Sequence, residues 1–206
     1  MTAPAPIVNQ TKLSMISAAL VLCGEKPMNS LTDPRYGAAV GAALFDMVYQ
    51  NEVQSNRWRF ATKKATLSQI NATPPNEWQY SFQLPADCLQ VIGFWGAGVD
   101  RSYEIYGGNI LYTNIKSNPG PVNNTTTPVL TLDYMFLPDP ATVPSYFALL
   151  TTLALAKYMM KPISENDTAA QALGVRYNEQ RNRAMFLDAS QRPNRPLQNN
   201  PFVSVR

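Results

Sequence analysis

The spacing of apolar residues changes twice along this chain of 206 residues, and these changes limit the folds it can adopt. Up to about residue 56, apolar side chains recur every three or four positions, which is typical of amphipathic helices. From 57 to 138 they alternate or form short continuous runs, which is typical of strands. Helical spacing returns from 139 to 190. The pattern therefore predicts an α+β protein with a strand region inserted between two helical regions.

The first helical region contains two predicted helices. In the first, Leu13, Ile16, Leu20 and Cys23 share one face, and Gly24 fits the left-handed position that follows a helix. The second is expected to begin with Asp33 as its cap and Pro34 as its first residue. Its apolar face is predicted to consist of Tyr36, Val40, Leu44, Met47 and Val48.

The first half of the second predicted helix carries unusually small side chains, at Gly37, Ala38, Gly41 and Ala42. Small side chains let another helix approach closely. Two interpretations are open. The residues could serve tight packing within the chain, or they could contact a neighbouring subunit.

The middle region is predicted to be an antiparallel β-domain of five or six strands, at 57–138. Trp58 and Phe60 alternate with basic residues at its start. A continuous apolar run over 88–96 has the length of a buried strand. Glycines 107 and 108 with Asn109 predict the turn of a β-hairpin.

The second helical region begins with an apolar segment over 146–160. It is too short to cross a bilayer, so it is interpreted as a helix buried on most sides. Pro162 is expected to stop this helix, and Ser164 is expected to cap the next one. The inward face of that last helix is predicted to contain Ala169, Leu173, Tyr177, Ala184 and Leu187. Its other face carries Arg176, Glu179, Arg181 and Arg183, which we interpret as a solvated surface rather than a binding patch.

Two helix pairs that are distant in sequence can bury their apolar faces by packing together. The sequence therefore predicts a four-helix bundle made of 1–56 and 139–190, with the β-domain inserted. Residues 191–206 are rich in proline and asparagine and cannot build a core. Because Phe202, Val203 and Val205 lie among polar neighbours there, we predict an extended arm that docks on another chain.

The composition argues against several kinds of reactive site. The chain has no histidine, the usual base of serine and cysteine hydrolases and a common metal ligand. Its two cysteines, Cys23 and Cys88, are far apart and form no metal-binding motif. Although Cys88 lies beside Asp87, Pro85 fits the entrance of a strand, so we interpret this stretch as structural. We therefore expect no catalytic residues, cofactor or metal.

The charge is modest and unevenly placed. The net charge is +3, which is too weak by itself to indicate nucleic-acid binding. From Gln171 onward there are six arginines and two acidic residues, so the basic excess lies in the last predicted helix and the arm.

Three sequence elements together resemble the tail tubular protein A family of T7-like phages. The first matches the family's Gly-Glu-x-Pro and Ser-Leu signature at Gly24, Glu25, Pro27, Met28, Ser30 and Leu31. The second matches at Gln54, Ser55, Trp58 and Phe60, but Arg57 replaces the family's usual glycine and Ala61 its usual asparagine. The third matches the Leu-Pro-x-Asp-x-Leu-x-Val segment at Leu84, Pro85, Asp87, Leu89 and Val91.

The resemblance implies a head-to-tail adaptor in a short-tailed bacteriophage. Family members form a ring of twelve copies beneath the portal, connect it to the nozzle (tail tubular protein B) and help make the channel for double-stranded DNA. The expected location is the virion at the head-tail junction, after synthesis in the host cytoplasm, with no membrane contact. The resemblance implies that the helical part forms the ring and the arm reaches the portal.

These implied contacts fall on two sets of residues. The subunit interface is expected at Gly37, Ala38, Gly41 and Ala42. The portal interface is expected on the arm, at Arg195, Leu197, Phe202, Val203, Val205 and Arg206.

Two other functions are weighed against the adaptor. An envelope glycan hydrolase would need two carboxylates at a set separation, with candidates at Asp87, Asp100, Glu104 and Asp133. A nucleic-acid-binding module would use the basic last helix and arm, with Arg181, Arg183, Arg192 and Arg195 as candidate phosphate contacts. No motif unites either set.

Overall fold

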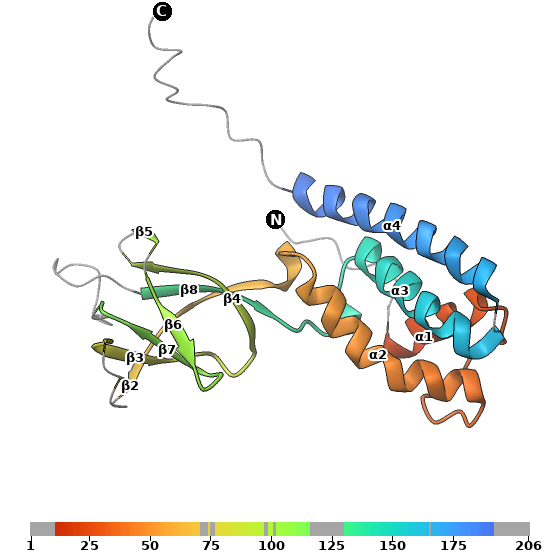
Figure 1. Cartoon of the computed structure of the whole chain (residues 1–206), viewed down its shortest axis with the longest axis horizontal. Coiled ribbons are helices and arrows are strands. Elements are labelled where there is room, and N and C mark those ends of the chain that lie inside the picture. Colours follow the sequence, from red (N-terminus) through yellow and green to blue (C-terminus); the bar gives the residue numbers. More distant parts are fainter. Residues whose placement is uncertain are drawn as a thin grey trace, which may run out of the picture. The chain divides into compact units, whose positions relative to one another are not determined.

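The structure is a computed structural model that describes residues 11–70, 74, 77–96, 99–100, 102–115, 130–164 and 166–191 (Figure 1). In this part of the chain the helices are α1 (Lys12–Leu22), α2 (Tyr36–Gln54), α3 (Ser145–Ser164) and α4 (Asp167–Ser190). None of them has an apolar stretch long enough to cross a membrane. Helices occur together with two antiparallel sheets, which confirms the predicted α+β class.

The chain divides into two compact units, and the division falls inside α2. One unit contains Ala42–Pro144 and, of the described N-terminal residues, Thr11 and Lys12. The other contains Leu13–Gly41 and the described chain from Ser145 onward. The domain boundaries expected from the sequence, at 56/57 and 138/139, differ from these division points because the second half of α2 groups with the strands.

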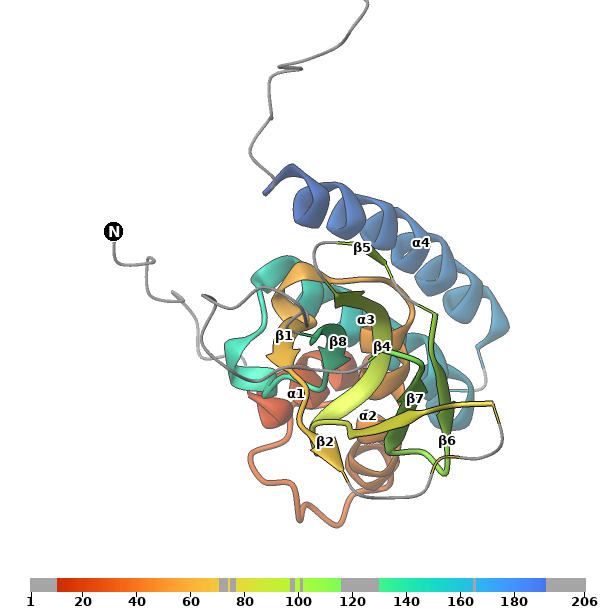
Figure 2. The same cartoon turned by 90° about the vertical axis from the view of Figure 1, so that its left-hand side faces the viewer.

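The strands of the first unit form two four-stranded antiparallel sheets (Figure 2). The first sheet has the order β1 (Thr62–Thr66), β8 (Leu130–Phe136), β4 (Cys88–Gly96), β5 (Val99–Asp100). The second has the order β2 (Gln69–Ile70), β3 (Tyr80–Gln83), β7 (Ile110–Thr113), β6 (Glu104–Tyr106). The described strands outnumber the five or six expected because two-residue strands such as β2 and β5 are added.

Both sheets contribute side chains to one core. This core consists of Leu67, Phe82, Leu84, Phe94, Leu111, Leu130, Leu132 and Tyr134. Strands β8 and β4, which supply four of them, are the long central strands of the first sheet. The apolar run at 88–96 is therefore a central strand. It is not a buried one throughout, because Gly93 and Phe94 are buried while Gln90 and Trp95 are exposed.

The predicted hairpin is confirmed. Strand β6 pairs antiparallel with β7, with Tyr106 opposite Ile110. Gly107 and Gly108, between the two strands, have φ angles of 63° and 82°, which glycine adopts without the strain of a β-carbon. The two glycines of the turn therefore determine the pairing of β6 with β7.

The alternation around Trp58 and Phe60 predicts a strand, and this prediction is wrong. Residues Arg59–Ala61 form a short 3₁₀ helix, and the strand begins only at Thr62. Trp58 is fully buried, and its indole N–H donates a hydrogen bond to the Glu52 carbonyl at 2.9 Å. Its place is thus determined by packing against the end of α2 rather than by a strand ladder.

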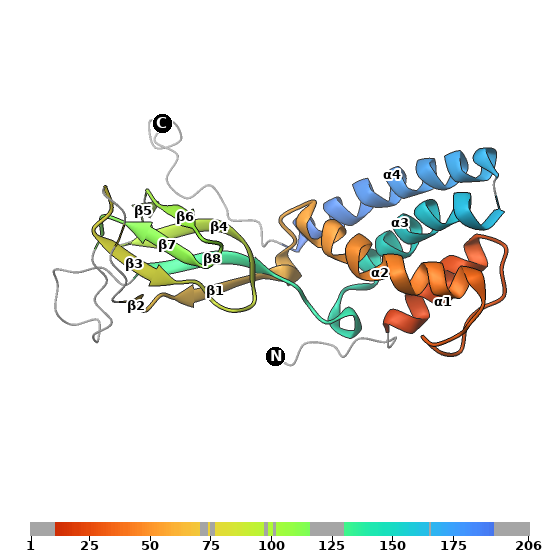
Figure 3. The ribbon, with the colours of Figure 1, turned by 60° about the horizontal axis from the view of Figure 1, so that its bottom comes forward.

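Helix α3 is buried over most of its surface, as predicted, and it packs beside α4 (Figures 1 and 3). The Tyr146 hydroxyl donates to the buried carboxylate of Asp188 at 2.9 Å, and the Gln180 amide donates to the Tyr146 carbonyl at 2.9 Å. Leu173 and Ala184 of α4 are buried, while the other three predicted inward residues are half-buried. The predicted inward face of α4 is therefore confirmed.

Two predicted helix ends are wrong by a few residues. Pro162 lies inside the last turn of α3, which continues to Ser164. The cap of α4 is Asn166, whose side chain accepts a hydrogen bond from the Ala169 N–H at 3.0 Å. A proline in the last turn removes only one helical hydrogen bond, so it does not stop the helix where it stands.

Helix α1 packs on α3 through the predicted apolar face. Ile16, Leu20 and Cys23 are buried, and the Cys23 thiol donates to the Ala156 carbonyl at 3.5 Å. Gly24 follows with a φ of 84°, the left-handed conformation expected after a helix.

Candidate interaction surfaces

The small residues of α2 pack against their own chain. Gly37, Ala38 and Gly41 are buried, and Ala42 is half-buried. A β-carbon at position 41 would lie 2.7 Å from Ile16 Cγ2 and 3.0 Å from Met159 Cε. One at position 37 would lie 2.7 Å from the Glu25 carboxylate. These contacts support the intrachain interpretation, and a contact with a second subunit at these four positions stays a prediction.

The apolar face predicted for α2 is not its buried face. Tyr36 is 65% exposed and Met47 is 63% exposed. The buried side chains are those in line with the glycines, namely Ala38, Phe45, Val48, Tyr49 and Val53. Tyr36, Val40, Ala43 and Met47 recur at helical spacing on the opposite side, and we call them the α2 outer stripe. Of the predicted face only Val48 is buried, so that prediction is corrected.

Helix α4 also presents apolar side chains away from its buried face. Val175 is 59% exposed and Phe186 is 71% exposed, three turns apart on the same side. Glu179 and Asn182 lie between them on the same side of the helix, and both are exposed. We call Val175, Glu179, Asn182 and Phe186 the α4 outer stripe.

The arginines predicted on the outside of α4 are placed less uniformly than expected. Arg176, Glu179 and Arg183 are exposed, as a solvated surface requires. Arg181 is half-buried on the inner side of the helix. Neither Arg176 nor Arg183 forms an ion pair with a residue that the structure describes. Glu179 therefore lies within the α4 outer stripe, and the two exposed arginines lie beside it.

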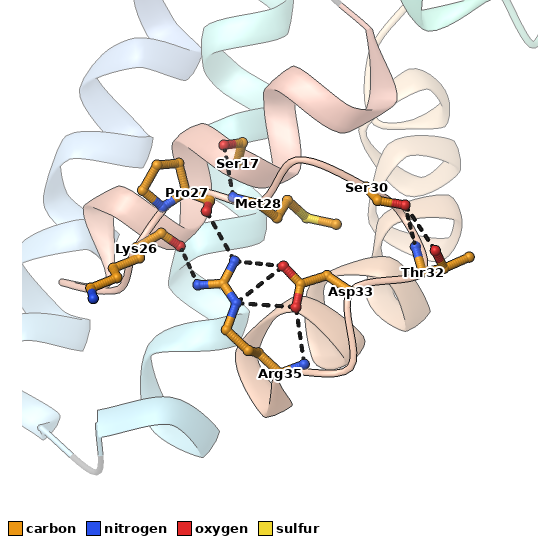
Figure 4. A network of polar contacts seen from close by, with 8 residues as sticks. All are labelled: Ser17, Lys26, Pro27, Met28, Ser30, Thr32, Asp33 and Arg35. Atoms are coloured by element: carbon orange, nitrogen blue, oxygen red, sulfur yellow. Dashed lines mark hydrogen bonds and ion pairs between the residues drawn. The ribbon is translucent and has the colours of Figure 1, made fainter.

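The loop between α1 and α2 carries the first resemblance element and is held by Arg35 (Figure 4). The guanidinium donates to the Lys26 carbonyl at 3.1 Å and the Pro27 carbonyl at 2.9 Å. It also pairs with the Asp33 carboxylate at 2.7 Å. The side-chain hydrogen bond from Arg35 to Asp33, followed by the one from the Arg35 N–H, holds the pKa of Asp33 below its usual value, so the ion pair is present at neutral pH. These contacts of Arg35 give the loop between α1 and α2 a defined conformation.

The role of Arg35 is not predicted by the sequence patterns. The sequence patterns predict that Asp33 caps α2. The Asp33 carboxylate does accept a hydrogen bond from the Arg35 N–H at 3.1 Å, but α2 begins only at Tyr36. An acidic residue two positions before an arginine, with proline between them, is the local signal that could have suggested this turn.

The two cysteines have the properties of structural thiols, with Cys23 buried and Cys88 half-buried. Both are free. Burial, followed by the nearby charge of Glu25, raises the pKa of Cys23 to about 11. Burial, followed by the charge of Asp87, also raises the pKa of Cys88. Both thiols are therefore protonated at neutral pH, and no metal-binding cluster lies among the described residues.

Asp87 is an ionised partner in a small polar network. Its carboxylate pairs with Lys63 at 2.8 Å and accepts a hydrogen bond from the Tyr134 hydroxyl at 3.0 Å. The hydrogen bond from Lys63 is the main reason why its pKa is lowered. Burial, followed by the hydrogen bond to Asp87, raises the pKa of Tyr134 to about 12, so the phenol remains a donor. A general acid needs a raised carboxyl pKa, which is the opposite of what Asp87 shows.

The structure does not bring the candidate hydrolase carboxylates together. Tyr134 points into the core of the two sheets, so its neighbour Asp133 points to the other face of β8. Asp133 is buried there beside Arg57 at 3.5 Å and Lys64 at 3.4 Å. Glu104 lies in the second sheet, where it accepts from the Tyr106 hydroxyl, and Asp100 lies in β5. Asp87 and Asp133 therefore reach opposite faces of one strand.

The predicted portal interface lies outside the described residues. This applies to Arg195, Leu197, Phe202, Val203, Val205 and Arg206, and also to Arg192 of the nucleic-acid hypothesis. The arm stays a prediction from the sequence.

Comparison with models of known protein families gives no match for this chain, and comparison with curated proteins gives none either. The resemblance therefore depends on the three sequence elements. In the structure they form the α1–α2 loop, the end of α2 with the 3₁₀ helix, and the entrance to β4.

Proposed function

We propose that this protein is a structural ring subunit of a short-tailed bacteriophage, an adaptor that joins the portal to the tail nozzle. Its partners are further copies of itself, the portal protein, the nozzle protein and the DNA that passes through the channel. It acts by geometry rather than by chemistry. This proposal combines the three sequence elements with the exposed surfaces of the helices.

The observation that carries the proposal is the exposure of large apolar side chains on two different helices. Tyr36 and Met47 of α2 and Val175 and Phe186 of α4 are each more than half exposed. Aligned apolar side chains facing water are typical of surfaces that another protein covers. A subunit that contacts neighbouring copies in a ring needs exposed surfaces of this kind.

We propose that the four helices form the ring-building bundle. Three contacts support it: Cys23 reaches α3, Gly41 packs against Ile16 and Met159, and Tyr146 bonds to Asp188. These contacts link every helix to α3. A rigid helical body is suited to a ring because small errors in subunit angle would prevent closure.

The charge fits a channel through which DNA slides. The net charge is +3, and Lys63, Lys64, Arg57 and Arg35 are all paired with carboxylates. Dense free cations would bind phosphates tightly and retard passage. A mildly charged wall permits passage without strong binding.

Mass photometry with the portal protein of the same phage tests the proposal. We expect the portal to gain a discrete mass that corresponds to a ring of copies. A protein that stays monomeric and binds neither portal nor nozzle would contradict the adaptor function.

A further inference from the structure

The face of the first sheet that is turned away from the core carries a cation, a carboxylate and an indole in one row. Lys64 of β1 is the cross-strand partner of Asp133 of β8, and Asp133 is the partner of Gly93 of β4. Cross-strand partners share a face. A β-carbon at position 93 would lie 3.0 Å from Nε1 of Trp95, so the indole lies against this glycine. Because neighbouring strands are about 4.8 Å apart, the row is about 10 Å long.

Asp133 is the member of this row that packing does not account for. The residue is 4% exposed, yet its Oδ1 atom accepts no hydrogen bond from the part of the chain that the structure describes. Lys64 and Arg57 lie 3.4 and 3.5 Å from its two oxygens, which is longer than the usual charge-assisted hydrogen bond. Such a buried pair contributes little to stability, because the cost of desolvation offsets the attraction. A hydrogen-bond acceptor with spare capacity therefore lies beside the indole.

The groups around Asp133 are accessible and carry a surplus of positive charge. The side chain of Arg57 is 58% exposed and that of Lys64 is 71% exposed. These two cations share one carboxylate, so one positive charge remains unbalanced. Trp95 is 38% exposed, whereas Trp58 is fully buried. The face thus offers an aromatic surface, an acceptor and an attraction for anions.

We propose that this face binds an unpaired nucleotide of a single-stranded nucleic acid. The base stacks on Trp95, an N–H group of the base donates to Asp133, and a phosphate is attracted by Arg57 and Lys64. Proteins bind single strands by combining an exposed aromatic side chain with cations that follow the phosphates. All of these residues belong to one compact unit of one chain, so the proposal does not depend on ring formation.

The same arrangement does not suit a duplex. There the faces of the bases are stacked on one another and their N–H groups are paired, so Trp95 and Asp133 find no partner. A duplex can meet only the surplus charge of Arg57 and Lys64, which is a weak and salt-sensitive contact. The site therefore selects single strands and is compatible with a channel along which double-stranded DNA slides.

The carboxylate of Asp133 also predicts a preference among bases. An ionised carboxylate only accepts hydrogen bonds. Cytosine has an amino group that can donate to it, whereas thymine has a carbonyl oxygen at the same position of its ring. Both are pyrimidines of similar size, so they stack on Trp95 to a similar extent. A strand of cytosines should therefore bind more tightly than a strand of thymines.

Fluorescence anisotropy of labelled oligonucleotides, about eight nucleotides long, tests the site in the full-length protein. We expect a mixed-sequence single strand to bind at least about tenfold more tightly than its duplex, because only the single strand stacks and donates. We expect oligo(dC) to bind about tenfold more tightly than oligo(dT), the effect of one hydrogen bond to a charged group.

Three substitutions assign the contacts. Trp95→Ala should weaken the binding of single strands at least about fivefold, the loss of one stacked base. Lys64→Gln should weaken it and lower the slope of log affinity against log salt by about 0.7. Lys63→Gln is the matched control, because it removes the same charge from the neighbouring residue, which pairs with Asp87 on the other face of β1. Asp133→Asn should abolish the preference for cytosine, because an amide donates as well as accepts.

The results that would overturn the proposal are specific. Equal affinity for single strand and duplex would overturn it, and so would equal losses in Lys64→Gln and Lys63→Gln, because both would show attraction by net charge alone. A preference for cytosine that is absent, or that Asp133→Asn leaves unchanged, would also overturn it. Circular dichroism checks the folding of each variant. The adaptor function would stand in all these cases, because it is tested separately with the portal.

Discussion

At the residue scale, Gly41 illustrates how one missing side chain determines the packing of a helix. Ile16 Cγ2 and Met159 Cε occupy the space that a β-carbon at position 41 would need. At Gly37, by contrast, the nearest atoms belong to the end of the Glu25 side chain, which can move. Both glycines lie in the same helix, so alanine would improve helix propensity equally at both.

This contrast gives a stability prediction. Gly41→Ala should destabilise the protein by about 1–2 kcal/mol, because overpacking a core costs more than the gain in helix propensity. Gly37→Ala, the matched control, should change the free energy of unfolding by less than about 0.5 kcal/mol or raise it slightly. Urea unfolding measures both. Equal effects at the two positions would contradict the packing described for Gly41.

The Asp87 network predicts a dependence of stability on pH. The pKa of Asp87 is lower in the folded chain than its ordinary value of 3.8, so its contribution is present above that pH. It is lost as the pH falls through the lowered pKa. Because the Asp87 side chain is 46% exposed, the contribution should not exceed about 1 kcal/mol.

Asp87→Asn tests this contribution. At pH 7 the variant should be less stable than the wild type by up to about 1 kcal/mol, and the difference should shrink at about pH 2–3. Unfolding by urea at the two pH values provides the comparison. A difference that does not change with pH would show that Asp87 acts through shape and not through its charge.

At the element scale, the β6–β7 hairpin depends on its two glycines. Gly108 has a φ of 82°, and no atom lies within 4 Å of the position that a β-carbon would take, so only backbone strain opposes a substitution. Gly108→Ala should cost about 1 kcal/mol, whereas Gly108→Asn should cost less, because asparagine tolerates this conformation better. Thermal unfolding of the two variants measures both losses of stability. Equal losses would contradict a conformational cause.

The sequence predicted most elements but not all of their faces. Four helices, the strand at 88–96 and the hairpin turn follow from local periodicity and turn residues, which depend only on neighbours in the chain. The pairing of β1 with β8 joins segments that lie far apart in the sequence, such as Thr66 and Thr131, and no local pattern specifies it. For the same reason, no local pattern predicts how the strands divide into two sheets.

The buried face of α2 differs from the predicted one for a definite physical reason. Both sides of this helix carry large apolar residues, with Tyr36 and Met47 on one and Phe45 and Tyr49 on the other. Periodicity alone cannot choose between them. The second side is the buried one because Ile16 and Met159 approach the helix closely there, which requires a small residue such as Gly41. Tyr36 and Met47 are left on the exposed side.

At the scale of the whole molecule, the C-terminal arm is expected to contribute affinity for the portal. Many weakly docking arms on one ring act together, so their combined binding exceeds that of one arm. Deletion of residues 194–206 should therefore weaken binding to the portal at least about tenfold, in line with the gain from multivalent contacts. Self-association without the portal should be unaffected.

Two measurements on one sample separate these effects. Mass photometry with portal reports arm docking, and sedimentation velocity without portal reports contact between copies. Portal binding that is unchanged by the deletion would refute the docking role of the arm. Loss of self-association would place the arm at the subunit interface instead.

Electron microscopy of the protein mixed with its portal tests the adaptor function most directly. We expect class averages in which a ring with an open channel lies beneath the portal and continues its axis. Images that show bare portals and only monomers of this protein, at concentrations well above those in an infected cell, would contradict the adaptor function.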